Sequence, residues 1–280
     1  MTPIIEISDL KKYYRSGIRS IAVEALGGIS LSVDEGEVFG LIGPNGAGKS
    51  TAIKIILGLI KESSGTCAVF GEKISSKAKE KIGYMPENPY FYRYLTGLEL
   101  VSFYAKLCGM TSSRAKDAAL RALRTVGLSD AANRRLSLYS KGMVQRAGLA
   151  QAIVHDPKLV VLDEPASGLD PIGAADMAQT VLKLKSEGKT VLLCSHMMSE
   201  VEKLCSRAAI LYRGKIAASG ELDELLSIQG RSRLDIDNAD SHTLDAVSEY
   251  ARKLGANVVK TSAAKISLDE FFRKTVETSK

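Results

Sequence analysis

The most constraining feature of the chain is a glycine-rich segment that matches the pattern G-x-x-x-x-G-K-[ST] at every fixed position. It reads Gly43-Pro44-Asn45-Gly46-Ala47-Gly48-Lys49-Ser50, with Thr51 next. Residues 38–42 before it are apolar and β-prone, which predicts a buried strand. Residues 51–60 after it have apolar side chains at helical spacing. This strand–loop–helix context predicts a loop that binds phosphate groups.

The residue types in this loop are suited to holding a triphosphate. Gly43, Gly46 and Gly48 let the backbone turn tightly and bring its N–H groups close to phosphate oxygens. The positive end of the following helix adds to this attraction. Lys49 is expected to reach the β- and γ-phosphates, and the Ser50 hydroxyl is expected to bind Mg²⁺. A simple glycine-rich turn is the alternative, and it leaves the complete pattern and both flanks unexplained.

Composition limits the class of protein further. The 280 residues allow one large domain, or one large and one small domain. The net charge of +6 is a mild basic excess without blocks of like charge, so we expect no nucleic-acid partner. The four cysteines are scattered without C-x-x-C spacing, which predicts small buried residues in a reducing compartment.

The sequence also bears on location. Residues 1–10 carry Glu6 and Asp9 and have no long apolar core, so we expect no signal peptide. No apolar run approaches the roughly 18 residues of a membrane-spanning helix. We therefore expect a cytoplasmic protein that is soluble on its own.

Hydrophobic spacing predicts an α/β fold. Short apolar runs predict strands over residues 4–10, 22–26, 29–33, 66–70, 81–85, 158–162, 190–194, 208–212 and 215–218. Helical spacing falls between several of them, at 141–152, 174–186, 197–204 and 221–228, and dominates residues 90–138. The alternation implies a parallel sheet with right-handed crossovers, preceded by an antiparallel β patch. We expect a domain over 1–220 with an inserted α-helical subdomain at about 88–155, and a small C-terminal α/β extension over 221–280.

Two acidic residues follow a predicted strand. Residues 159–162 are apolar, and Asp163 and Glu164 come next. Because α/β sheets bind ligands at the carboxyl ends of their strands, we expect Asp163 to hold Mg²⁺, directly or through water. Glu164 is expected to orient or deprotonate the attacking water. One acid alone would be an ordinary polar turn. His196 follows another predicted strand end, and this placement favours a functional histidine over a structural one.

A second glycine-containing segment reads Tyr139-Ser140-Lys141-Gly142-Met143 and opens a predicted helix. With the loop, the acidic pair and the histidine in this order, the chain resembles ATP-binding cassette (ABC) proteins, the ATPase subunits of ABC transporters. Their signature is L-S-G-G-Q, of which this chain keeps Ser140 and Gly142. The resemblance covers residues 4–220 and implies a P-loop NTPase with a RecA-like parallel sheet core.

The resemblance implies further site residues. Ser140 and Gly142 resemble a second anion site, and Asp170 lies in a stretch like the loop that crosses between two subunits, although Asp170-Pro171 also fits a helix start. His196 resembles the histidine that contacts the γ-phosphate. Tyr14, or Tyr13 in another register, resembles the aromatic residue that stacks on adenine. Glu87 stands where most of the family has glutamine; a carboxylate can ligate Mg²⁺ but cannot donate an N–H.

The resemblance also implies partners. In this family ATP lies between the phosphate loop of one subunit and the signature of another. The chain holds one cassette, so a second ATPase subunit, identical or not, is required. A separate membrane permease is implied as well, which would hold the chain at the inner face of the cell membrane, with a lean toward export. The aromatic segment 88–96 fits a permease-docking surface, or an anchor for the helical insert.

Two other functions remain open from the sequence. One is a soluble ATPase of the same type that acts on ribosomes or nucleic acid; its relatives carry paired cassettes or long coiled coils, which this sequence lacks. The other is a phosphotransferase, which would not explain Ser140, Gly142 or His196. The cargo is not indicated.

Overall fold

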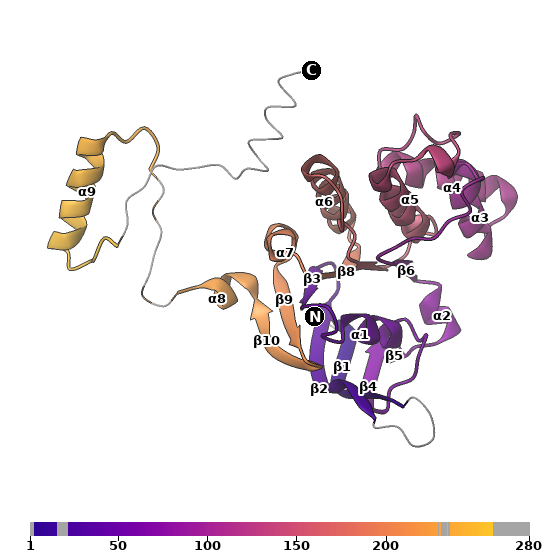
Figure 1. Cartoon of the computed structure of the whole chain (residues 1–280), viewed down its shortest axis with the longest axis horizontal. Coiled ribbons are helices and arrows are strands. Elements are labelled where there is room, and N and C mark those ends of the chain that lie inside the picture. Colours follow the sequence, from indigo (N-terminus) through magenta and orange to yellow (C-terminus); the bar gives the residue numbers. More distant parts are fainter. Residues whose placement is uncertain (1–2, 16–21, 229, 231–233, 235, 260–280) are drawn as a thin grey trace. The chain divides into compact units, whose positions relative to one another are not determined.

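The computed structural model describes residues 3–15, 22–228, 230, 234 and 236–259. The chain divides into two compact units, Met1–Leu226 and Ser227–Lys280 (Figure 1). The division lies a few residues after the expected boundary because Leu222 is buried in the core of the first unit and its N–H bonds to Ser206 O.

A four-stranded antiparallel sheet, of order β2-β1-β4-β5, forms the N-terminal β patch. Its strands are β1 (Pro3–Tyr14), β2 (Val23–Asp34), β4 (Ser64–Val69) and β5 (Glu72–Lys73). Two strands were expected at 22–26 and 29–33, but β2 runs continuously through them. Gly28, with φ +93°, lets the strand continue past a register irregularity in its pairing with β1.

A six-stranded sheet, of order β10-β9-β3-β8-β7-β6, forms the centre of the first unit. Its strands are β3 (Val38–Ile42), β6 (Ile82–Met85), β7 (Leu159–Asp163), β8 (Thr190–Ser195), β9 (Arg207–Tyr212) and β10 (Lys215–Glu221). All pairs are parallel except β9 and β10, which form the expected hairpin at Arg213-Gly214. The carboxyl ends of the parallel strands β3, β6, β7 and β8 therefore lie at the same edge of the sheet. This arrangement confirms the predicted α/β fold.

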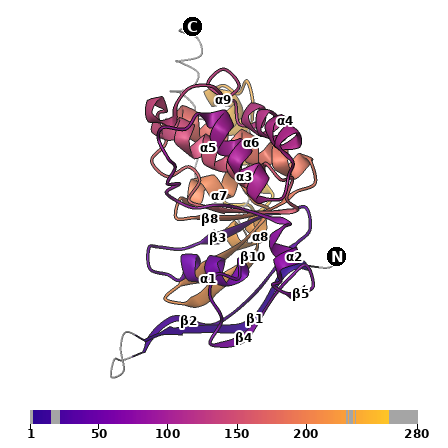
Figure 2. The same ribbon diagram turned by 90° about the vertical axis from the view of Figure 1, so that its right-hand side faces the viewer.

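Alternate residues of the central strands face two hydrophobic cores. On β3, Val38 and Ile42 belong to one core, while Phe39 and Leu41 belong to the other. The first core packs against helices, including those of the insert. The second packs against α1 (Lys49–Ile56) and the antiparallel sheet, so α1 lies between the two sheets (Figure 2).

The other regular elements of the first unit are helices. The inserted subdomain holds α3 (Gly97–Leu107), α4 (Ser112–Thr125), the short 3-10 helix Leu136–Leu138 and α5 (Lys141–Ile153). The other helices are α2 (Ser76–Lys79), α6 (Pro171–Ser186), α7 (Met198–Leu204) and α8 (Leu222–Leu226). Helical structure was expected from residue 90, yet α3 begins at Gly97 because Thr96 and Glu99 form a capping box.

The described part of the second unit contains α9 (Ser241–Lys253), whose first turn is capped by Asp240. Much of the expected α/β extension, including residues 260–280, lies outside the described residues. Within the described part of the chain, no helix has the length and apolar character needed to cross a membrane.

The cysteines differ from expectation in one respect. All four are free; Cys194 and Cys205 are buried, but Cys67 is half-buried and Cys108 is exposed. The prediction of four buried cysteines is therefore wrong for Cys108, which follows the last turn of α3 at the surface.

Candidate functional site

The glycine-rich loop between β3 and α1 forms the wall of a cavity of about 170 Å³. The lining residues are Ala25, Pro44, Asn45, Gly46, Ala47, Gly48, Lys49, Ser50, Thr51, Glu87, Asp163 and Glu164. No side chain caps the start of α1, so its first N–H groups are left for a ligand. A Cβ at Gly46 would enter open space, so the loop backbone is accessible there. This cavity fits phosphate groups.

Two loop glycines are required by close packing. A Cβ at Gly43 would lie 2.3 Å from the carbonyl oxygen of Leu211, and one at Gly48 would lie 2.7 Å from that of Ala25. Gly48 also has φ +112°, a conformation that other residues rarely adopt. The loop is thus wedged between β2 and β9.

Lys49 is buried and lies against its own loop. Its ammonium donates to the carbonyl oxygen of Gly43 and lies 3.4 Å from Oε1 of Glu164. Both side chains of this ion pair are under 8% exposed. The structure therefore brings together the lysine of the loop and the second acid of β7, which are far apart in the sequence.

The two acids differ in their surroundings. Asp163 is the last residue of β7; burial, then the charges of Glu164 and Glu87, raise its pKa to about 6. Glu164 has φ +51°, a strained value for a residue with a side chain, and its N–H donates to Cys194 O at 2.8 Å. Such strain is typical of functional sites.

His196 meets the same carboxylate from the end of β8. Its Nδ1 lies 2.7 Å from Oε2 of Glu164, and its backbone N–H also points to that oxygen, at 3.3 Å. Oε1 of Glu164 is buried without a hydrogen bond, although Lys49 is near. Glu164 thus contacts both of the other predicted catalytic residues and keeps one oxygen available for a donor such as water.

One residue near this site was missed by the sequence reasoning. Glu200 on α7 accepts a 2.7 Å hydrogen bond from the Ser195 hydroxyl, which in turn accepts from the N–H of Met197. Burial raises the pKa of Glu200. This network fixes the turn that carries His196. A glutamate in the first turn of a short predicted helix gives no signal for such a role.

The signature residues do not line the loop cavity. Ser140 caps α5 by accepting from the N–H of Met143 at 3.2 Å. The Lys141 side chain lies over Gly168, where a Cβ would be 1.9 Å from its Nζ, and Gly142 lies beside Leu169. The signature and the loop before α6 are therefore in contact within one chain. Asp170 caps α6 by accepting from the N–H of Gly173 at 2.7 Å.

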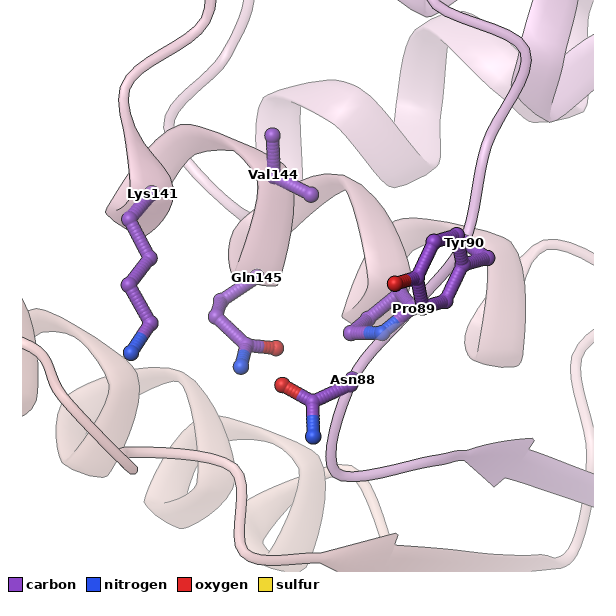
Figure 3. A pocket seen from close by; sticks show the side chains of 6 residues that line it. All are labelled: Asn88, Pro89, Tyr90, Lys141, Val144 and Gln145. Carbon is purple, nitrogen blue, oxygen red and sulfur yellow. The ribbon is translucent and has the colours of Figure 1, made fainter.

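A second cavity, of about 450 Å³, lies between the segment after β6 and the start of α5. It is lined by Asn88, Pro89, Tyr90, Lys141, Val144 and Gln145 (Figure 3). Gln145 is 2% exposed; its Nε2 donates to Glu87 O at 2.9 Å, while its Oε1 has no hydrogen bond. Gln145 thus ties the helical subdomain to the edge of the loop cavity.

The aromatic segment 88–96 splits into two kinds of residue. Phe91 packs against the helical core and makes an edge-to-face contact with Tyr104 at 6.3 Å between ring centroids. Tyr90 is 95% exposed, and Tyr92 and Tyr94 are each 67% exposed. Anchoring and docking were alternatives in the sequence; Phe91 anchors the insert, and the three tyrosines are free for other contacts.

The tyrosines expected near adenine lie at the end of β1. Tyr14 pairs with Val23 on β2, and Val23 is two residues away from Ala25, which lines the cavity. The Nζ of Lys12 lies 5.4 Å from the centroid of the Tyr14 ring. Tyr13 pairs with Glu24, whose side-chain hydrogen bond raises the pKa of Tyr13. Neither ring lines the cavity, so the stacking role stays a prediction.

Oxygen atoms suited to a divalent cation lie in the loop cavity. Ser50 and Asp163 offer a hydroxyl and a carboxylate, as Mg²⁺ prefers. In the described residues no group of three or more His, Cys, Asp or Glu could hold a metal alone. This donor set fits a cation that takes its remaining ligands from phosphates and water, and direct ligation by Glu87 stays a prediction.

Comparisons with known proteins agree with these features. Residues 26–167 match the family model for ABC transporters. The chain is 40% identical to an ABC transporter ATP-binding protein of Nostoc sp. over 301 aligned positions, which cover 98% of this chain and 90% of that protein. It is 40% identical to the linearmycin resistance ATP-binding protein LnrL of Bacillus subtilis over 230 positions, covering 81% of this chain and 72% of LnrL.

A solved structure gives the same result for the fold. A dimeric ATP-binding cassette in a post-hydrolysis state, bound to ADP and Pi, is 26% identical with a TM-score of 0.69. The match covers 78% of this chain and 98% of that one. The phosphate loop, the acidic pair at the end of β7 and these similarities together lead to one conclusion. The chain belongs to the ABC transporter ATP-binding proteins, the subunits that bind and hydrolyse ATP.

Proposed function

We propose that this chain binds ATP in half of a composite site, and that the signature of a second subunit completes it. One observation carries the proposal. The loop cavity brings Lys49 and Glu164 together but contains neither Ser140 nor Gly142. The start of α5 therefore offers its N–H groups elsewhere, as a cover for nucleotide held by another copy. The dimeric relative bound to ADP and Pi supports this arrangement.

Each residue of the loop cavity has a proposed role. The loop N–H groups and Lys49 hold the triphosphate, and Ser50 and Asp163 hold Mg²⁺, which offsets charge on the phosphates when bound. Glu164 accepts a proton from the attacking water through Oε1, the oxygen that makes no hydrogen bond in the protein. His196 holds the other oxygen of Glu164 and stands next to the γ-phosphate position.

The partner of the ATPase is a membrane permease. We infer that it docks on the surface formed by Tyr90, Tyr92 and Tyr94, because these rings are exposed beside the second cavity. The chain then works at the inner face of the cell membrane. Export is favoured over import because the related LnrL is named for linearmycin resistance.

Complementation between variants tests the composite site. In a Glu164→Gln background, which blocks hydrolysis, one variant also carries Lys49→Ala and another carries Ser140→Arg. Each alone should stay monomeric with ATP, because every composite site has one damaged half. An equimolar mixture should form dimers, because one site then combines an intact loop with an intact signature.

Size-exclusion chromatography with light scattering measures the outcome. The Glu164→Gln protein alone serves as the control, and it should dimerise with ATP. If it does so while the mixture stays monomeric, the head-to-tail arrangement is wrong. If Lys49→Ala or Ser140→Arg dimerises alone, the two halves do not depend on each other.

A further inference from the structure

Glu87 places a carboxylate at the wall of the loop cavity. It follows β6, which pairs in parallel with β7, so it reaches the same sheet edge as Asp163 and lines the same cavity. Its carbonyl oxygen accepts a 2.9 Å hydrogen bond from the buried Gln145. The backbone of Glu87 is therefore held in place by α5, although the side chain itself is exposed.

Negative charge exceeds positive charge among the residues that line this cavity. Among the described residues of the lining, Glu87, Asp163 and Glu164 are acidic, and Lys49 is the one basic residue. Lys49 is already paired with Glu164 at 3.4 Å. Two of the three carboxylates follow the ends of the neighbouring strands β6 and β7, so this excess of negative charge is gathered at one edge of the sheet.

Glutamine at this position would remove one of these charges without changing the shape of the side chain. The loop N–H groups and the start of α1 attract phosphate, but these are partial charges. Metal-free ATP would bring the full negative charge of its triphosphate into a cavity that is lined by three carboxylates. A bound divalent cation cancels much of that charge and is itself attracted to carboxylate oxygens.

We propose that Glu87 makes this site select the magnesium complex of ATP over metal-free ATP. The inference rests on the proposed binding of ATP in the loop cavity. Magnesium then governs entry of the nucleotide as well as its hydrolysis.

Equilibrium binding with a non-hydrolysed analogue tests the proposal. The β,γ-imido analogue of ATP is titrated into the full chain by calorimetry, once with excess Mg²⁺ and once with EDTA, at mildly alkaline pH. Glu87→Gln should tighten metal-free binding by about tenfold, the effect of removing one unit charge from a partly solvated site. Binding of the magnesium complex should change by less than about threefold, so the ratio of the two dissociation constants should fall.

Two further variants separate charge from shape. Glu87→Asp keeps the charge and should retain the wild-type ratio. Glu35→Gln removes an exposed charge from the turn before β3, at the strand end opposite the loop, and should leave the ratio unchanged. Raising the salt concentration should narrow the difference between wild type and Glu87→Gln, because screening weakens the repulsion.

The outcomes are distinguishable. If the wild type binds the magnesium complex but Glu87→Gln keeps the wild-type ratio, the role of Glu87 is wrong and the proposed function stands. If the wild type binds neither form, both fail. Equal thermal unfolding midpoints for the wild type and Glu87→Gln would show that any change in the ratio does not come from misfolding.

Discussion

Lys49 and Glu164 form an ion pair in which both side chains are buried, with 3.4 Å between Nζ and Oε1. Removing one partner leaves the other charge in a poorly solvated place. Lys49→Ala should therefore lower the free energy of unfolding of the nucleotide-free protein by about 1–3 kcal/mol, besides abolishing ATP binding. Adding Glu164→Gln should restore much of this loss. Urea denaturation measures both; equal stability of the single and double variants would contradict the coupling.

The loop glycines differ in what a side chain would meet. Gly43→Ala places a methyl group against the carbonyl oxygen of Leu211 and should cost about 2–4 kcal/mol of stability. Gly46 (φ +78°) and Gly36 (φ +81°) both have open space around them. Alanine at either should cost about 1–2 kcal/mol from backbone strain alone. Only Gly46→Ala should also weaken ATP binding, which titration with nucleotide would show; Gly36→Ala is its matched control.

Substitutions in the aromatic segment before α3 should distinguish effects on stability from effects on partner binding. Phe91→Ala should destabilise the protein by about 2–3 kcal/mol because its partly buried ring packs against the helical core. Tyr92→Ala and Tyr94→Ala should change stability by under about 1 kcal/mol, since both rings are largely exposed. Both tyrosine variants should weaken recovery of a permease complex while basal ATPase is unchanged. If both variants recover the permease complex at the wild-type level, the proposed docking surface is wrong.

The raised pKa of Glu200 predicts that the stability of the fold depends on pH. Its folded-state pKa is raised by burial, so ionisation is less favourable in the folded than in the unfolded chain. This cost is absent below the unfolded-state pKa, grows as the pH rises from the unfolded-state pKa to the folded-state pKa, and is constant above that. Glu200→Gln, which can still accept from Ser195, should therefore gain stability relative to wild type as the pH rises. Thermal unfolding over a pH series measures the difference, and parallel curves would refute the assignment.

The cysteines should differ in reactivity. Burial raises the pKa of Cys67 and of Cys205 to about 12, and Cys194 is fully buried with its pKa raised well above the ordinary value. Cys108 is exposed. A maleimide should therefore modify Cys108 first, and Cys108→Ser should remove the fast phase followed by mass spectrometry. If the fast phase persists in Cys108→Ser, the folded chain has a second accessible thiol.

Much of the fold follows from local sequence signals. Short apolar runs predicted β3, β7 and β8 because these strands are buried along their whole length and need apolar residues throughout. The start of α3 was misjudged, because the helical spacing that begins at Leu98 was extended back to residue 90, although Thr96 caps the start of the helix. The continuity of β2 through Gly27 and Gly28 was missed because two glycines are ordinarily read as a turn.

Local sequence patterns likewise predict part of the candidate site and miss the rest. The loop and the acidic pair are each contiguous in the chain, so local sequence patterns are enough to name their residues. The contacts of Glu164 with Lys49 and His196 depend on which strands are neighbours, and the order β3-β8-β7 is a long-range property. The hydrogen bond from Gln145 to Glu87 O joins a helical insert to a sheet edge, and no local pattern encodes it.

The contact between Lys141 and Gly168 joins the start of the signature helix to the loop that precedes α6. Gly168 has φ +68°, a conformation that residues with a side chain rarely adopt, so a side chain at 168 would be strained whatever residue stands at 141. The ammonium of Lys141 is the far end of a flexible side chain, so it is the lysine that can give way in this contact. A shift of the signature helix against its neighbouring loop therefore requires the Lys141 side chain to move, while the turn at Gly168 keeps its shape.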